Sequence, residues 1–196
     1  MTARAWLLAV TAFMLSAQPA FTHPAPLGIG GFPGGLVHPL FVPAHAMAVL
    51  ALGLLIGQQA MWTRLAALSF MLGLAAGLGV MTLGIVPTRM NELVLGGALI
   101  AGLLATLARP VPETLGCVLA VLLGFCIGLD SPPEAISLAE ANLMLIGTGL
   151  GTAALLILAI ATASRLKAGW ARIGARILGS WIAASAILVL VLRFAR

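Results

Sequence analysis

The chain has 196 residues, of which 62% are apolar and only 8% charged, whereas a water-soluble domain is about 25% charged. This composition and the mean hydropathy of +1.17 exclude an ordinary soluble protein and predict an integral membrane protein. Ten Lys and Arg outnumber five Asp and Glu, but the cations are dispersed through short segments, which excludes a basic patch for nucleic acid and is typical of loops between membrane spans.

The N-terminal segment has the layout of a secretory signal. A single cation, Arg4, precedes an apolar run of signal-peptide length, and small residues and prolines follow it. The cleavage point stays open between Ala17 and Thr22, and an uncleaved signal anchor is the alternative. We therefore predict a signal peptide or signal anchor over residues 1–22 and a single six-helix transmembrane domain over residues 23–196.

Six apolar stretches follow, each near the roughly 20 residues that a helix needs to cross a bilayer. Backbone in lipid must satisfy its own hydrogen bonds, and these stretches lack the alternation of barrel strands, so they are predicted to be helices. Because the linkers are short, consecutive helices should be antiparallel neighbours in one all-α bundle. The predicted spans are residues 43–59, 64–86, 91–108, 113–129, 142–163 and 173–193.

The first span opens with the stretch LVHPLFVPAHAMAVL, which holds two prolines and two of the three histidines of the chain. Pro39 and Pro43 resist a helix interior, so the helix should begin at Pro43, with His38 in a non-helical approach and His45 in the first turn. On one straight helix the two residues would be about 10 Å apart along the axis. The break can let His38 fold back toward His45, which makes the pair a candidate metal site.

Glycines four residues apart recur in the apolar stretches and are typical of helices that pack closely in lipid. We interpret them as packing positions without a chemical role. The pairs are Gly53 and Gly57, Gly73 and Gly77, Gly124 and Gly128, and Gly147 and Gly151.

The distribution of cations predicts the orientation of the bundle, because cytoplasmic loops are enriched in Lys and Arg. If residue 23 begins outside, the mature N-terminus and the C-terminus are both extracytoplasmic in a multi-pass protein of the inner (plasma) membrane. The inner loops then hold Arg64, Arg109, Arg165, Lys167, Arg172 and Arg176, and the outer segments hold Arg89, Arg193 and Arg196.

Further candidate ligands lie near the outer side of the predicted fourth span. Asp130 and Glu134 follow this span, Cys126 lies inside it, and His23 would begin the mature chain if cleavage follows Thr22. Imidazole suits Ni(II), Co(II), Cu and Zn, a thiolate favours softer ions, and carboxylates add compensating charge. The alternatives are a solvated loop charge or helix cap for Asp130, a packing residue for Cys126, and polar anchors at the membrane surface for the histidines.

The stretch HPLFVPAHAMAVLALGLLIGQQ resembles the signature span of the HupE/UreJ family of hydrogenase and urease accessory membrane proteins. His38 and Pro39 match the family's His-Pro, His45 matches its second histidine, and residues 46–53 loosely follow its LAMxAVGLW-like run. The signal-like N-terminus and the six spans are similar over the whole chain. Two features depart from the family. Its aspartate before the second histidine is Ala44 here, and GFCIGLDSPPE replaces its histidine-rich HGxAHGxE-type motif.

This resemblance implies a permease for a divalent transition metal, nickel or cobalt, that serves metalloenzyme maturation. The metal would be cargo, with no tightly bound cofactor, and the expected partners are the lipid bilayer and the metal ion, with a homo-oligomer left open. A non-transporting scaffold or accessory subunit is the alternative, because the two departures are what a branch that lost transport would look like. An enzyme is not expected, since the chain lacks HExxH, GxSxG and any histidine after His45.

Overall fold

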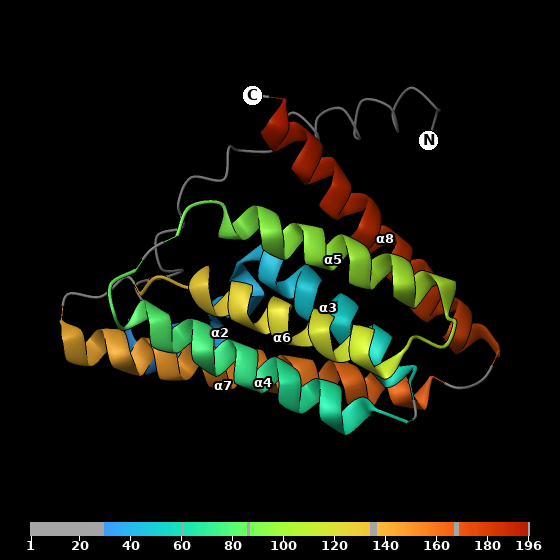
Figure 1. The fold of residues 1–196 in the computed structure, drawn as a ribbon, viewed down its shortest axis with the longest axis horizontal. Coiled ribbons are helices and arrows are strands. Elements are labelled where there is room, and N and C mark those ends of the chain that lie inside the picture. The colour runs from blue at the N-terminus through green and yellow to red at the C-terminus, as the bar shows by residue number, and fades with distance from the viewer. Residues whose placement is uncertain (1–29, 60, 86, 134–136, 167–168, 196) are drawn as a thin grey trace, which may run out of the picture.

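A computed structural model describes residues 30–59, 61–85, 87–133, 137–166 and 169–195, and its regular structure there is entirely helical (Figure 1). The all-α fold is therefore confirmed for this part of the chain, and the predicted signal segment lies outside the described residues. In chain order the helices are α2 (Gly31–Phe41), α3 (Pro43–Gly57), α4 (Thr63–Met81), α5 (Met90–Leu107), α6 (Glu113–Leu129), α7 (Leu138–Arg165) and α8 (Gly169–Phe194).

Helix length and composition identify the membrane-crossing candidates among the described residues. The helices α4, α5, α7 and α8 are each long and apolar enough to cross a membrane, and α2 with α3 passes the same test as one span bent by 70°. The helix α6 is apolar but shorter, with 17 residues. Each of the six predicted stretches therefore contains a helix, and four or five of these helices meet the length and composition required of a span.

The prediction of a non-helical approach to the first span is wrong, because residues 31–41 form the helix α2. Pro39 lies inside α2, and the break comes only at Val42, whose φ of −94° and ψ of 103° are extended. A residue before proline is pushed out of the helical region. Pro43 then begins α3 as predicted, at a position where its missing N–H does no harm.

Tertiary packing explains why the glycine-rich α2 is helical at all, since a short helix gains most of its stability from the surface that it packs against. Gly35 of α2 lies against the backbone of Met144 and Thr148 on α7. In return, Gly147 and Gly151 of α7 lie against the backbone of α2. A side chain at any of these glycines would overlap the neighbouring helix, so α2 depends on contact with α7.

The same kind of contact joins α4 to α6 and α3 to α7, which confirms the packing role predicted for the four glycine pairs. Gly73 and Gly77 face the backbone of α6 near Val121 and Phe125, and Gly124 and Gly128 face the backbone of α4 in return. Gly53 and Gly57 of α3 face Ala159 and Ala163 of α7. Close backbone approach increases dispersion contact where lipid offers no hydrophobic driving force.

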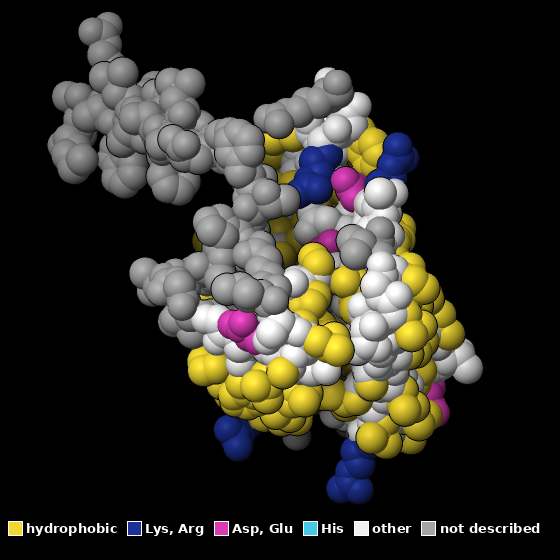
Figure 2. Space-filling view, turned by 90° about the vertical axis from the view of Figure 1, so that its left-hand side faces the viewer, with side chains coloured by type: hydrophobic (Ala, Val, Ile, Leu, Met, Phe, Trp, Pro, Cys, Tyr) yellow, Lys and Arg dark blue, Asp and Glu magenta, His cyan; other side chains and the backbone are white. Residues whose placement is uncertain are grey.

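The alternation of the helices gives the bundle two ends of opposite character. The basic end, at residues 57–59, 61–64, 107–113, 165–166 and 169–176, includes the ends of α3, α5 and α7 and carries Arg64, Arg109, Arg165, Arg172 and Arg176 with Glu113. The acidic end, at residues 81–85, 87–92, 129–133, 137–140 and 193–195, includes the ends of α4, α6 and α8 and carries Glu92, Asp130 and Glu140 with Arg89 and Arg193. Figure 2 views the molecule from the acidic end, where charged side chains lie among apolar ones.

Candidate metal-binding site

The bend between α2 and α3 brings the two imidazoles of the first span together. His38 lies in the last turn of α2 and His45 in the first turn of α3. Their ring centroids are 5.5 Å apart, with the rings edge to face at 62°. The predicted approach of His38 to His45 is therefore confirmed, although the bend between two helices achieves it rather than an unwound segment.

A carboxylate from a distant helix joins this pair. Nε2 of His45 lies 3.0 Å from Oδ2 of Asp130, across 85 residues of sequence. Nδ2 of Asn91 donates a hydrogen bond to the same Oδ2, also over 3.0 Å. The side chain of His45 is 0% exposed and that of Asp130 20% exposed, so the imidazole is enclosed and the carboxylate reaches toward the acidic end.

Three helix ends fix the geometry of this contact. Asp130 caps the C-terminus of α6, where its own N–H bonds the carbonyl of Cys126. The buried Ser131 donates to the carbonyl of Ile127 over 2.7 Å and holds the chain as it leaves the helix. Asn91 is the second residue of α5. The carboxylate position is therefore set by how α3, α5 and α6 pack, and Asp130 has little freedom to be elsewhere.

Nδ1 of His45 on α3 and Oγ1 of Thr152 on α7 are among the buried polar atoms that lack a hydrogen-bond partner within the described residues. The helices α3 and α7 run in the same direction, because Gly53 meets Ala159 and Gly57 meets Ala163. Extended back along both helices, this alignment places His45 level with Gly151, the residue before Thr152. Buried polar atoms are nearly always satisfied by protein, water or a bound ion. This layer of the bundle is thus a candidate place for a ligand.

A family model described as HupE / UreJ protein matches residues 11–189, nearly the whole chain. The chain belongs to the HupE/UreJ family. Searches among curated proteins and among solved structures find no match. The family membership predicted from residues 38–53 is confirmed, and the bend with its two imidazoles lies inside the matched region.

This HupE/UreJ protein brings together only part of the predicted ligand set. Among the described residues no group of three or more His, Cys, Asp and Glu side chains is placed to hold one metal ion. Cys126 is partly buried and packs against the hydrophobic core, which agrees with the alternative of a packing residue. Glu134 and His23 lie outside the described residues. Of the predicted ligands, the structure brings the rings of His38 and His45 side by side and bonds His45 to the carboxylate of Asp130.

Two buried or partly buried polar residues near this site, Asn91 and Thr152, were not predicted from the sequence. Asn91 was visible as an uncharged polar residue at the start of an apolar stretch, but nothing in the sequence connects it to Asp130. Thr152 lies in the middle of α7 and carries no sequence signal that separates it from other threonines in apolar helices. Asn91 reaches Asp130 only through the packing of helices that are far apart in the chain.

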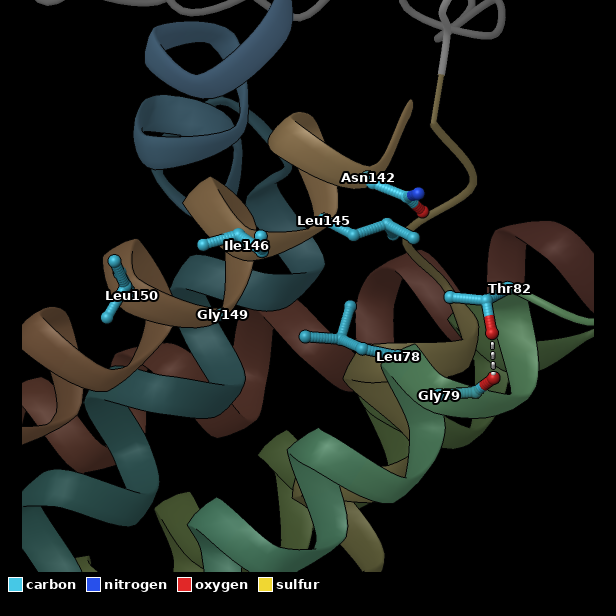
Figure 3. Close-up of a pocket in the computed structure, with 8 residues that line it drawn as sticks. All are labelled: Leu78, Gly79, Thr82, Asn142, Leu145, Ile146, Gly149 and Leu150. Carbon is cyan, nitrogen blue, oxygen red and sulfur yellow. Dashed lines mark hydrogen bonds between the residues drawn. The ribbon is translucent and has the colours of Figure 1, made fainter. Parts of the chain in front are cut away.

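A groove on the outside of the bundle is separate from this site. It lies between α4 and α7 (Figure 3) and has a volume of about 540 Å³. Its walls are mostly aliphatic, and the hydroxyl of Thr82, the residue after α4, donates to the carbonyl of Gly79 over 2.7 Å. Its lining residues are Leu78, Gly79, Thr82, Asn142, Leu145, Ile146, Gly149 and Leu150. The groove contains no metal-ligating side chain.

Proposed function

We propose that this HupE/UreJ protein is a membrane permease for a divalent transition-metal ion, nickel or cobalt, that supplies metalloenzyme maturation. The observation that carries the proposal is the pair of imidazoles at the α2–α3 bend, 5.5 Å apart, with one of them bonded to a carboxylate. Ionisable side chains inside an apolar bundle are costly and mark pathways for substrates and ions. Imidazole nitrogen suits Ni(II) and Co(II), and a carboxylate compensates their charge.

The small number of protein ligands fits transport better than storage. A permease must bind its ion and then release it, so two imidazoles with water in the remaining positions are more useful than a closed cage. At the acidic end Glu92 pairs with Arg193 over 3.3 Å, and Asp130 and Glu140 add further negative charge. Negative charge at this end raises the local concentration of cations and favours entry from this side.

The route beyond His45 is closed in this conformation. The side chains of Val49, Leu52 and Ile56 on α3 are 0% exposed and fill the interior between His45 and the basic end. Gln59 and Trp62 tie the loops of the basic end together through the carbonyls of Arg109 and Val111. We therefore propose that the site opens toward the acidic end only, and that transport requires α3 to move about its bend.

We further propose that the bundle crosses the inner membrane six times with its basic end in the cytoplasm. The 17 residues of α6 are at the lower limit of about 17–25 for a span, and α2 with α3 forms one bent span. Five described arginines lie at the basic end and two at the acidic end. The positive-inside tendency then places the acidic end, with the candidate site, on the extracytoplasmic side.

Reporter fusions test this topology. A fusion after the C-terminus and one inserted in residues 131–139 should be active outside the cytoplasm, whereas one near Lys167 should report the cytoplasm. An alkaline phosphatase and a green fluorescent protein fusion at each position give opposite readouts and control for expression. A cytoplasmic C-terminus would contradict the six-span proposal.

A non-transporting scaffold is the second candidate function. It is favoured by the absence of a three-ligand group among the described residues and by Ala44, which is buried where the family has an aspartate. Uptake of radiolabelled nickel and cobalt by a transport-deficient host separates the two proposals. The permease should raise accumulation of at least one metal above that of an empty vector. Normal insertion into the membrane without accumulation of either metal would favour the scaffold.

Replacing Pro43 by alanine tests the role of the bend. Alanine restores an N–H and permits helical geometry at Val42, so α2 and α3 should straighten and the two rings should move apart while every ligand side chain remains. We expect weaker binding of nickel to the purified protein and slower uptake. Pro39→Ala is the matched control, because Pro39 lies inside α2 and the break lies after it. Equal binding by both variants and the wild type would make Pro43 a packing residue.

A further inference from the structure

We infer that Asp130 acts on the metal through His45: it holds the proton of the imidazole on Nε2 and leaves Nδ1 as the nitrogen that binds the ion. The inference rests on the proposed function. It changes the role expected for Asp130 from metal ligand to positioning residue. It also assigns a positioning role to Asn91, which holds the carboxylate.

The first step is the crowding of donors around one oxygen. Nε2 of His45 and Nδ2 of Asn91 both lie 3.0 Å from Oδ2 of Asp130. An ionised carboxylate only accepts hydrogen bonds, and the amide nitrogen of asparagine only donates them. The imidazole must therefore donate from Nε2. Because a neutral imidazole carries one N–H, its proton is on Nε2 and its lone pair is on Nδ1.

The second step is the state of the other ring nitrogen. Nδ1 of His45 is buried in a side chain that is 0% exposed, and it has no hydrogen-bond partner among the described residues. Metal ions bind the lone pair of a neutral imidazole. The ring that carries this enclosed lone pair lies beside a second imidazole, that of His38, with 5.5 Å between the ring centroids. Nδ1 is therefore the nitrogen of His45 suited to an ion.

The third step concerns the carboxylate itself. Oδ2 of Asp130 already accepts two hydrogen bonds, and within the described part of the chain Asp130 does not converge with two other ligating side chains on one point. In many metal sites a carboxylate accepts the N–H of a ligating histidine, which fixes the tautomer, orients the ring and makes the other nitrogen more basic. Asp130 is placed to accept the N–H of His45 in this way, and the hydrogen bond from Asn91 holds its carboxylate.

Nitrogen-15 NMR of ring-labelled histidine tests the assignment on the full chain in lipid nanodiscs, with Zn²⁺ as the probe. The chain has three histidines, and the resonances of His45 are those lost in His45→Gln. We expect that Zn²⁺ shifts Nδ1 of His45 while Nε2 keeps its proton. A metal-induced shift of Nε2 with a proton on Nδ1 would overturn the inference and leave the permease proposal standing. No binding and no shift at any histidine would overturn both.

Calorimetric titration with Zn²⁺ separates positioning from direct coordination. Asp130→Ala should weaken binding about 10–100-fold, the usual effect of losing an outer partner of a ligating histidine. Asp130→Asn keeps an acceptor for Nε2–H, so it should weaken binding less and retain the Nδ1 shift. Asn91→Ala should also weaken binding, and Asn142→Ala, in the separate groove, should not. Equal losses in Asp130→Asn and Asp130→Ala, with helicity unchanged, would identify Asp130 as a ligand and overturn the inference.

Discussion

Replacing His45 by alanine is expected to abolish nickel or cobalt uptake by this protein at normal expression. His45 has the fully buried imidazole of the site, and the same ring links the carboxylate of Asp130 to the neighbouring His38. Removing it takes away both a nitrogen ligand and the group that Asp130 orients. A loss of one imidazole from a site with few protein ligands leaves too little affinity to capture the ion from water.

Initial rates of uptake in the transport-deficient host measure this effect, with each variant compared at the same amount in the membrane. His38→Ala should also lower uptake markedly, Cys126→Ser should matter less, and Met47→Leu should matter least. Met47 is the matched control because it lies two residues after His45 on α3 and packs against the core. His45→Gln retains most of the side-chain volume and guards against a packing defect. Normal transport by both histidine variants would contradict the permease and favour the scaffold.

The parts of the fold that could be predicted from the sequence depend on local rules. Apolar length alone located a helix in each of the six stretches, because a lipid-exposed backbone leaves no other structure available. Pro43 fixed the start of α3, because proline acts on its own residue and the one before it. The close approach of His38 to His45 was also accessible, since both residues flank the same break.

The helix α2 and the site partners could not be predicted for the same physical reason. The segment GFPGG has poor helix propensity, and it is helical because Gly35 packs against α7, a contact across more than a hundred residues. Asp130 was a candidate as a charged residue at the end of a span. Its bond to His45 and its support from Asn91 arise only when α3, α5 and α6 are assembled. Position 44 shows this, because the family's aspartate is Ala44 here and the carboxylate that reaches His45 comes from Asp130 at the end of α6 instead.

The contact between α4 and α6 should be the most sensitive part of the scaffold, because their backbones touch. Gly73→Leu places a side chain against the backbone of Val121 and Phe125, which cannot rotate away. Overpacking of this kind costs about 1–3 kcal/mol or more. Gly79→Leu on the same helix is the matched control, because nothing lies within 4 Å of a Cβ at that position. It should change stability by no more than about 0.5 kcal/mol.

Reversible unfolding in mixed micelles, followed by circular dichroism, gives the free energy of unfolding of both variants. The effect should extend to the site, because α6 carries Asp130 at its C-terminus and a helix pushed away from α4 shifts the carboxylate relative to His45. Gly73→Leu should therefore lower both the free energy of unfolding and the affinity for Zn²⁺, and Gly79→Leu should lower neither. Equal free energies of unfolding for the two leucine variants would contradict a close backbone contact between α4 and α6. The position of Asp130 would then be fixed by Asn91 and Ser131 instead.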